Sequence, residues 1–349
     1  MKKLYSATPL EVLSRIEEKA EEEGIQFFGV VKAQRVPLFE KYKNLVENFS
    51  IKELQYLKKI RERENPENIF PSVKSIMAFL FPYPFDRTNS LNLKKNKIAH
   101  FALGDDYHKK IKKKLKNITK EIPGNCRILC DTSPFLEKPY GAKAGLGFMG
   151  KNTLLINKIY GSAFNLGFIL TEYVFEEKIL NFKGSCGDCK RCLEVCPTGA
   201  LEKPYFLNPE KCISFLTMEA KEIPAEPKER WGYIYGCDLC QAVCPFNEDL
   251  IFEKGEELCL PRVPEERLKE NIKIVEKERI EVFIRQKDFY FPLNPVLRFE
   301  LKSILKEGVY YFNGFNFEGV PGGKKGKLIE FFSNLSLVER DKPFEIFVN

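Results

Sequence analysis

The chain has 349 residues, of which 44% are hydrophobic and 30% are charged, and its formal net charge is +7. This composition can fill the cores of two or three domains, and it excludes disordered, collagen-like and coiled-coil proteins. No stretch approaches the ~20 apolar residues that cross a bilayer, and acidic residues follow soon after the basic start. We therefore expect a cytoplasmic protein that is neither exported nor bound to a membrane.

Two residue types restrict the chemistry further. Only two histidines occur, His100 and His108, which removes most His-based zinc sites and catalytic schemes. The 11 cysteines are an odd number in a chain with no recognisable export signal. They argue against a disulfide framework and favour metal ligation in a reducing compartment.

The first 178 residues alternate predicted helices and strands. A helix is predicted from Thr8 to Gly24, because Thr8 and Glu11 form a capping box with Pro9 in the first turn. A charged helical stretch is expected over residues 39–63. Apolar runs predict buried strands at residues 25–31, 75–81, 127–130, 153–156 and 163–171.

A lysine-rich helix is predicted over residues 107–120. Tyr107, Ile111, Leu115 and Ile118 share one face, and seven lysines occupy the others. This pattern has two interpretations: a solvated helix that covers a core, or a surface that contacts nucleic-acid phosphates.

Asp131 follows the predicted strand 127–130. Ser133 and Pro134 resemble the start of a short helix that Pro139 and Gly141 should interrupt. Asp131 is therefore either a turn or capping residue, or a proton donor at the end of a strand, beside a cofactor.

A glycine-rich segment, Gly145-x-Gly147-x-x-Gly150-Lys151, formally matches a dinucleotide-binding fingerprint and nearly matches a P-loop. The P-loop requires Ser or Thr where Asn152 stands, and the fingerprint requires a strand directly before it, where we expect a loop or broken helix. The glycines instead predict a close approach of the backbone to another group.

Four cysteines form the run Cys186-x2-Cys189-x2-Cys192-x3-Cys196-Pro197, which is typical of ferredoxins with two [4Fe–4S] clusters. In such runs the first three thiolates hold one cluster and the fourth binds the other. Two-residue gaps let a tight loop reach three corners of one cluster, whereas the longer gap turns the last sulfur away.

A second run, Cys237-x2-Cys240-x3-Cys244-Pro245, lacks its first cysteine because Ile234 stands in that position, and Cys212 is the natural substitute. Two zinc sites are the alternative for two sets of four thiolates. We assign one cluster to Cys186, Cys189, Cys192 and Cys244, and the other to Cys196, Cys212, Cys237 and Cys240. The remaining cysteines, Cys126, Cys130 and Cys259, are expected to be buried free thiols.

These features together resemble the epoxyqueuosine reductase family, which comprises the cobalamin- and iron–sulfur-dependent enzymes of tRNA queuosine synthesis. The resemblance covers about residues 1–250 and is most specific in five segments: 131–138, 144–155, 186–201, 212–217 and 235–245. It implies an oxidoreductase that reduces the epoxide of epoxyqueuosine at the wobble position of tRNA to queuosine.

The resemblance also implies roles for individual residues. Asp131 would protonate the departing oxygen, with a pKa raised by burial beside the corrin. The resemblance implies no histidine below the cobalt, and His108, after Asp106 and Tyr107, is expected to be an ordinary residue of the lysine-rich helix. Positions that match those lining cobalamin in the family are Arg63, Ala99, Asp131, Leu155, Leu166, Ser214, Cys237 and Asp238.

The resulting prediction is a mixed α+β or α/β fold in three parts. We expect an N-terminal α/β cobalamin-binding domain in residues 1–178, a ferredoxin-like domain with two [4Fe–4S] clusters in residues 179–250, and a C-terminal region of unknown role in residues 251–349. The expected partners of this monomer are tRNA carrying epoxyqueuosine in its anticodon loop and an external low-potential electron donor. Candidates for phosphate contacts are the lysines of residues 107–120, Lys138, Lys143 and Lys151.

Two other functions remain open from the sequence. A cobalamin-dependent reductive dehalogenase would share the cofactor and the two clusters. A ferredoxin-type electron carrier would explain the cysteines but would leave most of the chain without a role.

Overall fold

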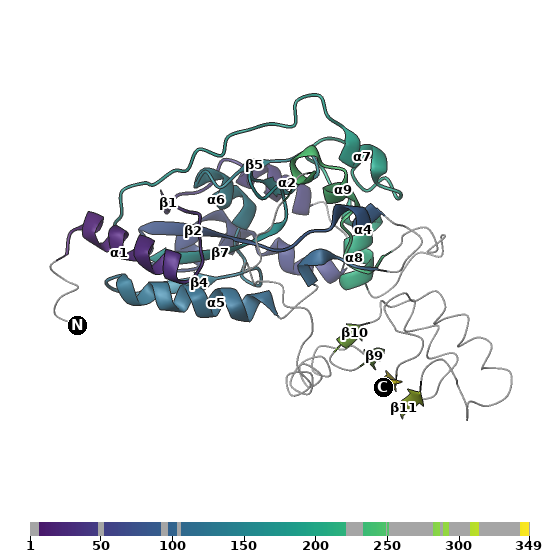
Figure 1. The fold of residues 1–349 in the computed structure, drawn as a ribbon. Helices are drawn as coiled ribbons and strands as arrows, with labels where there is room; N and C mark the ends of the chain where they lie inside the picture. The colour runs from purple at the N-terminus through teal and green to yellow at the C-terminus, as the bar shows by residue number, and fades with distance from the viewer. Residues whose placement is uncertain are drawn as a thin grey trace, which may run out of the picture.

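The structure is a computed structural model. It describes residues 7–47, 52–91, 97–102, 106–220, 233–248 and 250, together with four C-terminal strands. Its main sheet has the strand order β1-β2-β7-β4, and every neighbouring pair is antiparallel (Figure 1). The strands are β1 (Phe28–Lys32), β2 (Ser75–Pro82), β4 (Cys126–Leu129) and β7 (Phe164–Thr171).

Helices cover both faces of this sheet. On one face lie α1 (Pro9–Glu22) and the lysine-rich α5 (Tyr107–Ile118), and on the other lie α2 (Phe39–Glu47) and α6 (Glu137–Lys143). The β2 strand is buried on both sides because Met77 and Phe79 pack on the α1 and α5 side, whereas Ile76 and Leu80 pack on the other. This double burial explains its uninterrupted apolar sequence.

The α5 helix approaches β7 closely at Gly167. A Cβ atom at that position would lie 2.6 Å from a methyl group of Ile111 and 2.9 Å from one of Leu115. Glycine therefore allows the apolar face of the lysine-rich helix to contact the sheet directly. The predicted core stripe of this helix is confirmed, since Ile111, Leu115 and Ile118 are all fully buried.

The cysteine-rich region contains short elements joined by loops: α7 (Arg191–Val195), α8 (Ile213–Met218), β8 (Tyr233–Tyr235) and α9 (Leu239–Ala242). A short parallel pairing of β3 (Lys97–Ile98) with β8 connects this region to the first part of the chain, the predicted N-terminal domain of residues 1–178. A shared apolar cluster contains Ala99 together with Ile213, Leu216, Tyr233 and Leu239. The two predicted N-terminal parts are therefore packed against each other.

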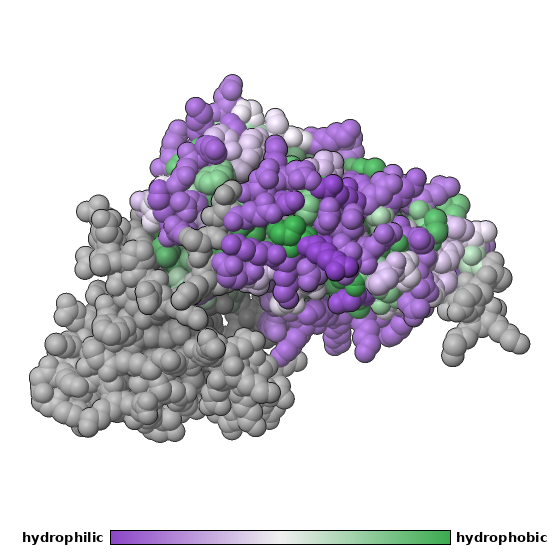
Figure 2. Space-filling model, turned by 180° about the vertical axis from the view of Figure 1, so that it is seen from behind, coloured by the Kyte–Doolittle hydropathy of each residue, from purple (hydrophilic) through white to green (hydrophobic). Residues whose placement is uncertain are grey.

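The remaining described elements are short or C-terminal. The short ones include α3 (Ile60–Glu64), α4 (Arg87–Leu91), β5 (Phe148–Met149) and β6 (Leu155–Ile156), with 3-10 turns at Lys52–Lys58, Pro66–Asn68, His100–Ala102, Thr119–Glu121, Pro209–Lys211 and Pro245–Asn247. The C-terminal strands β9 (Val282–Gln286), β10 (Phe289–Pro292), β11 (Gly308–Asn313) and β12 (Pro343–Val348) form an antiparallel sheet in the order β10-β9-β12-β11. Within the described part of the chain, no helix combines the length and apolarity needed to span a membrane. Figure 2 shows that hydrophilic side chains cover most of the described part of the face it presents.

Several sequence predictions need correction. The helical stretch expected over residues 39–63 divides into α2, a 3-10 turn and α3. The helix expected at Ser133 begins only at Glu137, and Pro139 and Gly141 do not interrupt it. Pro139 lies in the first turn, where its missing N–H costs no helical hydrogen bond, and Gly141 packs against Leu155 and Leu166, where a side chain would clash.

Candidate active site

A cavity lies between the first part of the chain and the cysteine-rich region. Its empty space, including the open mouth, is about 1440 Å³. Asp131, Glu137 and Tyr107 line it, and Leu155 and Leu166 supply apolar surface. Cys196, Cys212, Cys237 and Cys240 line the same cavity. The cavity thus joins a carboxylate, an apolar surface and four thiols.

Asp131 is held at the end of β4 in the left-handed backbone region, with φ of 56°. Aspartate tolerates this conformation better than most residues. Its backbone N–H donates to Oε1 of Glu137 at 2.5 Å, and the Tyr107 hydroxyl donates to its Oδ2 at 3.0 Å. Asp131 is therefore positioned through both its backbone and its side chain.

His108 completes this arrangement. Its Nε2 lies 3.0 Å from Oδ2 of Asp131, and its Nδ1 lies 2.9 Å from Oδ1 of Asp106. These carboxylates raise the pKa of His108 to about 9, with the hydrogen bond to Asp106 as the largest cause and that to Asp131 next. His108 lies on the basic helix as predicted, and its ring in addition bridges Asp106 and Asp131, a role that the sequence did not indicate.

The same contacts fix the charge of Asp131. The hydrogen bond with His108 lowers the pKa of Asp131 below its ordinary value; burial opposes this effect, and Tyr107 reinforces it. The prediction of a raised pKa for Asp131 is thus wrong for this structure. By contrast, burial raises the pKa of the neighbouring Glu137 to about 7.

The cysteines lie in two neighbourhoods. Burial raises the pKa of Cys244 to about 11, and its thiol neighbours are Cys186, Cys192 and Cys189. Burial likewise raises the pKa of Cys237, whose thiol neighbours are Cys212 and Cys196. Cys240 has Cys237 and Cys212 nearby, and also Cys192 of the first neighbourhood. Among the residues that the structure describes, no group of three or more His, Cys, Asp or Glu side chains is arranged to hold a single metal ion. Cys126 and Cys130 are free thiols, half-buried and buried respectively, whereas Cys259 lies outside the described residues.

The residues predicted to contact cobalamin divide into two groups. Asp131, Leu155, Leu166, Ser214 and Cys237 line the cavity. Arg63, Ala99 and Asp238 are buried and are not among its lining residues.

Arg63 is held by contacts with Phe135 and Tyr42. Its Nη1 donates to the carbonyl oxygen of Phe135 at 3.4 Å, and its guanidinium lies 5.7 Å from the ring centre of Tyr42. Its Nε is buried and has no hydrogen-bond partner. Arg63 therefore retains one buried donor that a bound group could satisfy.

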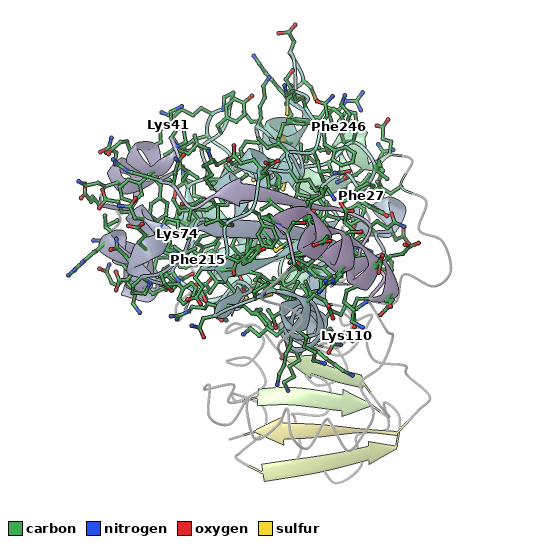
Figure 3. All side chains as sticks on the ribbon, turned by 90° about the vertical axis from the view of Figure 1, so that its left-hand side faces the viewer. Phe27, Lys41, Lys74, Lys110, Phe215 and Phe246 are labelled. Carbon is green, nitrogen blue, oxygen red and sulfur yellow. The ribbon has the colours of Figure 1, made fainter. Side chains whose placement is uncertain are left out.

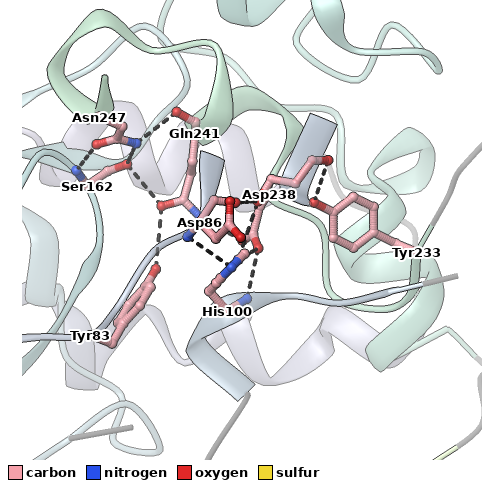
Figure 4. Close-up of polar contacts among 9 residues, drawn as sticks. Tyr83, Asp86, His100, Ser162, Tyr233, Asp238, Gln241 and Asn247 are labelled. Carbon is pink, nitrogen blue, oxygen red and sulfur yellow. Dashed lines mark hydrogen bonds and ion pairs between the residues drawn. The ribbon is translucent and has the colours of Figure 1, made fainter. Parts of the chain in front are cut away.

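Asp238 connects the cysteine-rich region to the rest of the chain (Figure 4). Its Oδ2 accepts from the backbone N–H of His100 and lies 2.8 Å from Nδ1 of the same residue. Nε2 of His100 accepts from the backbone N–H of Asp86, so Nδ1 carries the proton that bonds to Asp238.

A second part of this network reaches the cavity. Gln241 donates to Asp238 through Nε2, and its Oε1 accepts from the hydroxyl of Ser162 at 2.9 Å (Figure 4). Ser162 and Gln241 both line the cavity. Sequence reasoning missed Tyr83, Tyr107, Glu137, Ser162 and Gln241, because no local spacing marks residues that meet only through the fold.

The lysines predicted to contact phosphates differ from one another in exposure and in hydrogen-bond partners. Lys138 is exposed at the cavity and donates to the carbonyl oxygen of Thr153, and Lys143 donates to that of Lys32. Lys151 is buried, with 8% exposure, and donates to carbonyl oxygens of the first cysteine loop. A phosphate contact for Lys151 is therefore excluded in this structure.

Two family models match the chain. The model described as "Epoxyqueuosine reductase QueG, DUF1730" matches residues 63–132, and the "4Fe-4S double cluster binding domain" matches residues 185–247. The second match covers all eight predicted ligands and supports two clusters.

Relatives and solved structures agree with these models. The epoxyqueuosine reductase of Prochlorococcus marinus is 36% identical over 68% of this chain and 79% of its own length, and that of Cyclobacterium marinum is 34% identical over 72% and 84%. The structure of epoxyqueuosine reductase from Bacillus subtilis, with a catalytic aspartate loop swung out of its active site, matches with a TM-score of 0.64 and 28% identity over 73% of this chain and 70% of that one. On these grounds the chain belongs to the epoxyqueuosine reductase family.

Proposed function

We propose that this chain reduces epoxyqueuosine in tRNA to queuosine, using cobalamin and two [4Fe–4S] clusters. The observation that carries this proposal is that Asp131 and four of the proposed cluster ligands, Cys196, Cys212, Cys237 and Cys240, line one cavity. An electron source and a proton donor thereby meet at one site. A solved epoxyqueuosine reductase in complex with an epoxyqueuosine-modified tRNA stem loop, which matches with a TM-score of 0.61, supports the substrate.

The cavity lining suits a large cofactor that has an apolar face and polar groups around it. Leu155, Leu166 and Phe164 supply apolar surface, and Ser214 and Gln241 supply polar groups. The buried Nε of Arg63, which is outside the lining, is an unused donor. When bound, cobalamin would supply low-potential electrons at the cavity.

The cysteines would supply the clusters. We propose that Cys186, Cys189, Cys192 and Cys244 hold one cluster, and that Cys196, Cys212, Cys237 and Cys240 hold the other, next to the cavity. The two thiol neighbourhoods support this interleaved arrangement. Their electrons would come from an external low-potential donor.

One of the protons would come from the Asp131 site. Opening the epoxide and releasing its oxygen as water requires two electrons, which the clusters would deliver through cobalamin, and two protons, of which the second would come from solvent. Because His108 lowers the pKa of Asp131, the resting proton is held at Nε2 of His108, between the two side chains. We propose that Asp131 passes this proton to the departing oxygen, while Tyr107 and Glu137 keep its carboxylate in place.

The α5 lysines are the candidates for tRNA contacts. The helix begins with Tyr107, which lines the cavity, and Lys109, Lys112 and Lys113 are exposed along it. A wobble base extruded from its loop would enter the cavity while its flanking phosphates lie near these lysines. We further propose a cytoplasmic monomer.

Anaerobic purification followed by an assay on epoxide-containing tRNA tests the proposal. The expected result is conversion to queuosine by protein that carries iron and corrin. Turnover of an organohalide but not of the tRNA would favour a dehalogenase. Absence of corrin binding would favour a simple electron carrier.

A further inference from the structure

The glycine-rich segment that ends in Lys151 has no role in the proposed function so far. Its glycines allow close packing: a Cβ atom on Gly147 would lie 2.3 Å from the carbonyl oxygen of Ile156, and one on Gly150 would lie 2.5 Å from the Cδ1 methyl group of the same residue. The predicted close approach of this backbone is confirmed. It brings the next residue, Lys151, against the first cysteine loop.

Lys151 makes three contacts with that loop. Its ammonium group donates to the carbonyl oxygen of Gly187 at 2.6 Å and to that of Cys189 at 2.9 Å. Its backbone N–H lies 3.4 Å from Sγ of Cys186, within hydrogen-bond distance for sulfur. A buried charge is costly unless it is hydrogen-bonded, and these two carbonyl groups supply acceptors.

The following residue extends the contact to the other thiol set. Asn152 lines the cavity, and its Nδ2 lies 3.5 Å from the carbonyl oxygen of Cys240. Lys151 and Asn152 together therefore contact a loop from each proposed cluster, and Asn152 also lines the cavity.

We propose that Lys151 sets the reduction potential of the cluster held by Cys186, Cys189, Cys192 and Cys244. This inference depends on the proposed cluster ligands. Adding one electron makes a cluster more negative, and a nearby positive charge stabilises that reduced form. Hydrogen bonds to the ligand sulfur have the same effect. Lys151 thus makes this cluster easier to reduce by the external donor.

The test uses the full chain, purified anaerobically with both clusters. Lys151→Met removes the charge and Lys151→Arg keeps it, while Lys143→Met is a control at a lysine that donates to the carbonyl oxygen of Lys32. Each protein is titrated with dithionite at set potentials, and the reduced clusters are quantified by electron paramagnetic resonance.

We expect Lys151→Met to lower the reduced-to-oxidised ratio of one cluster about tenfold at a fixed potential, which corresponds to a midpoint ~59 mV more negative. Lys151→Arg and Lys143→Met should stay near the parent midpoint. A parent-like midpoint in Lys151→Met, or an equal shift in Lys151→Arg, would overturn the inference.

Iron content separates the other outcomes. If Lys151→Met loses iron, Lys151→Gln is titrated in its place, since it retains an amide donor without the charge. The same shift of the midpoint is then expected, and a parent-like midpoint would overturn the inference. If the parent protein itself holds no [4Fe–4S] clusters, the proposed function fails. If the parent holds both clusters and the uncharged variants titrate like it, only the role of Lys151 fails.

Discussion

The imidazole of His108 bridges two carboxylates, with Nε2 3.0 Å from Asp131 and Nδ1 2.9 Å from Asp106. Because each ring nitrogen faces an acceptor, the doubly protonated ring is favoured, and the pKa of His108 rises to about 9. Asp131 is correspondingly ionised at rest. The proposed proton donor is therefore a pair of side chains, in which His108 holds the proton that Asp131 delivers.

This pair predicts a distinct pH profile. In the parent protein the single-turnover rate should remain flat up to about pH 9, where His108 loses its proton. In His108→Gln, Asp131 must take its proton from solvent, so the rate should fall about tenfold per pH unit above the ordinary aspartate pKa of ~4. Rates measured from pH 5.5 to 9.5 on a tRNA stem loop provide the check. Parallel profiles for the two proteins would contradict the role of His108.

The pair also predicts a pH window for stability. The pKa of His108 is raised, so its contribution is complete below the unfolded value of ~6.5 and is lost as the pH rises through about 9. The pKa of Asp131 is lowered, so its contribution is present above ~4 and is lost as the pH falls through the folded pKa. Both contributions are complete between about pH 4 and pH 6.5, so the difference in urea midpoint between the parent and His108→Gln should be largest in that window. A difference that does not change with pH would show that the substitution acts through packing instead.

Substitution of Asp131 tests its chemical role. Asp131→Asn keeps the size of the side chain but cannot transfer a proton, so turnover should fall by about 10²- to 10⁴-fold. Iron and corrin contents should match the parent protein, since the proposed cluster ligands are unchanged. Parent-like turnover by the corrin-loaded variant would remove Asp131 from the mechanism.

The interleaved clusters predict an unusual pattern of thiol exposure. In Cys244→Ala, the cluster that loses its fourth ligand should be the one held by the first run, although Cys244 belongs to the second. Mass spectrometry after alkylation of the native protein should then find label on Cys186, Cys189 and Cys192. Label on Cys237 and Cys240 instead would indicate that each run holds its own cluster.

The α5 lysines predict salt-dependent binding of tRNA. Lys112→Gln and Lys113→Gln should each reduce the slope of log affinity against log salt by about 0.7, the value for one phosphate contact with a single strand. Lys41→Gln is the matched control, because Lys41 is exposed on α2 and lies away from Lys110 of α5 (Figure 3). A flat salt response in the parent protein would exclude a phosphate-dominated interface.

Spacing along the chain predicted the features that depend on neighbouring residues. The capping box of Thr8 and Glu11 is present, and the cysteine runs fall within the double-cluster match. The apolar runs also predicted the ends of β2 and β7 to within one residue, because both strands are buried on two faces. Strand direction was not predictable, because an apolar run does not distinguish parallel from antiparallel pairing.

The roles of single polar residues depended on the tertiary structure. His108 and Asp131 are 23 residues apart and meet only because α5 packs beside β4. Lys151 looked like a surface lysine, since nothing local indicates that the first cysteine loop covers it. Asp238 was predicted as a cofactor contact from the resemblance, whereas its side-chain bond to His100 could not be predicted because the two residues meet only through the fold.

The bond between Asp238 and His100 joins residues 138 positions apart and fastens the second cysteine run to the first part of the chain. A protein made under iron starvation would lack the clusters that fix the conformation of this run. The cysteine segments that line the cavity would then be less firmly held against the first part of the chain. We therefore expect iron supply to control how long the protein survives proteolysis in the cell. A truncated chain that ends near residue 178 should be degraded quickly for the same reason.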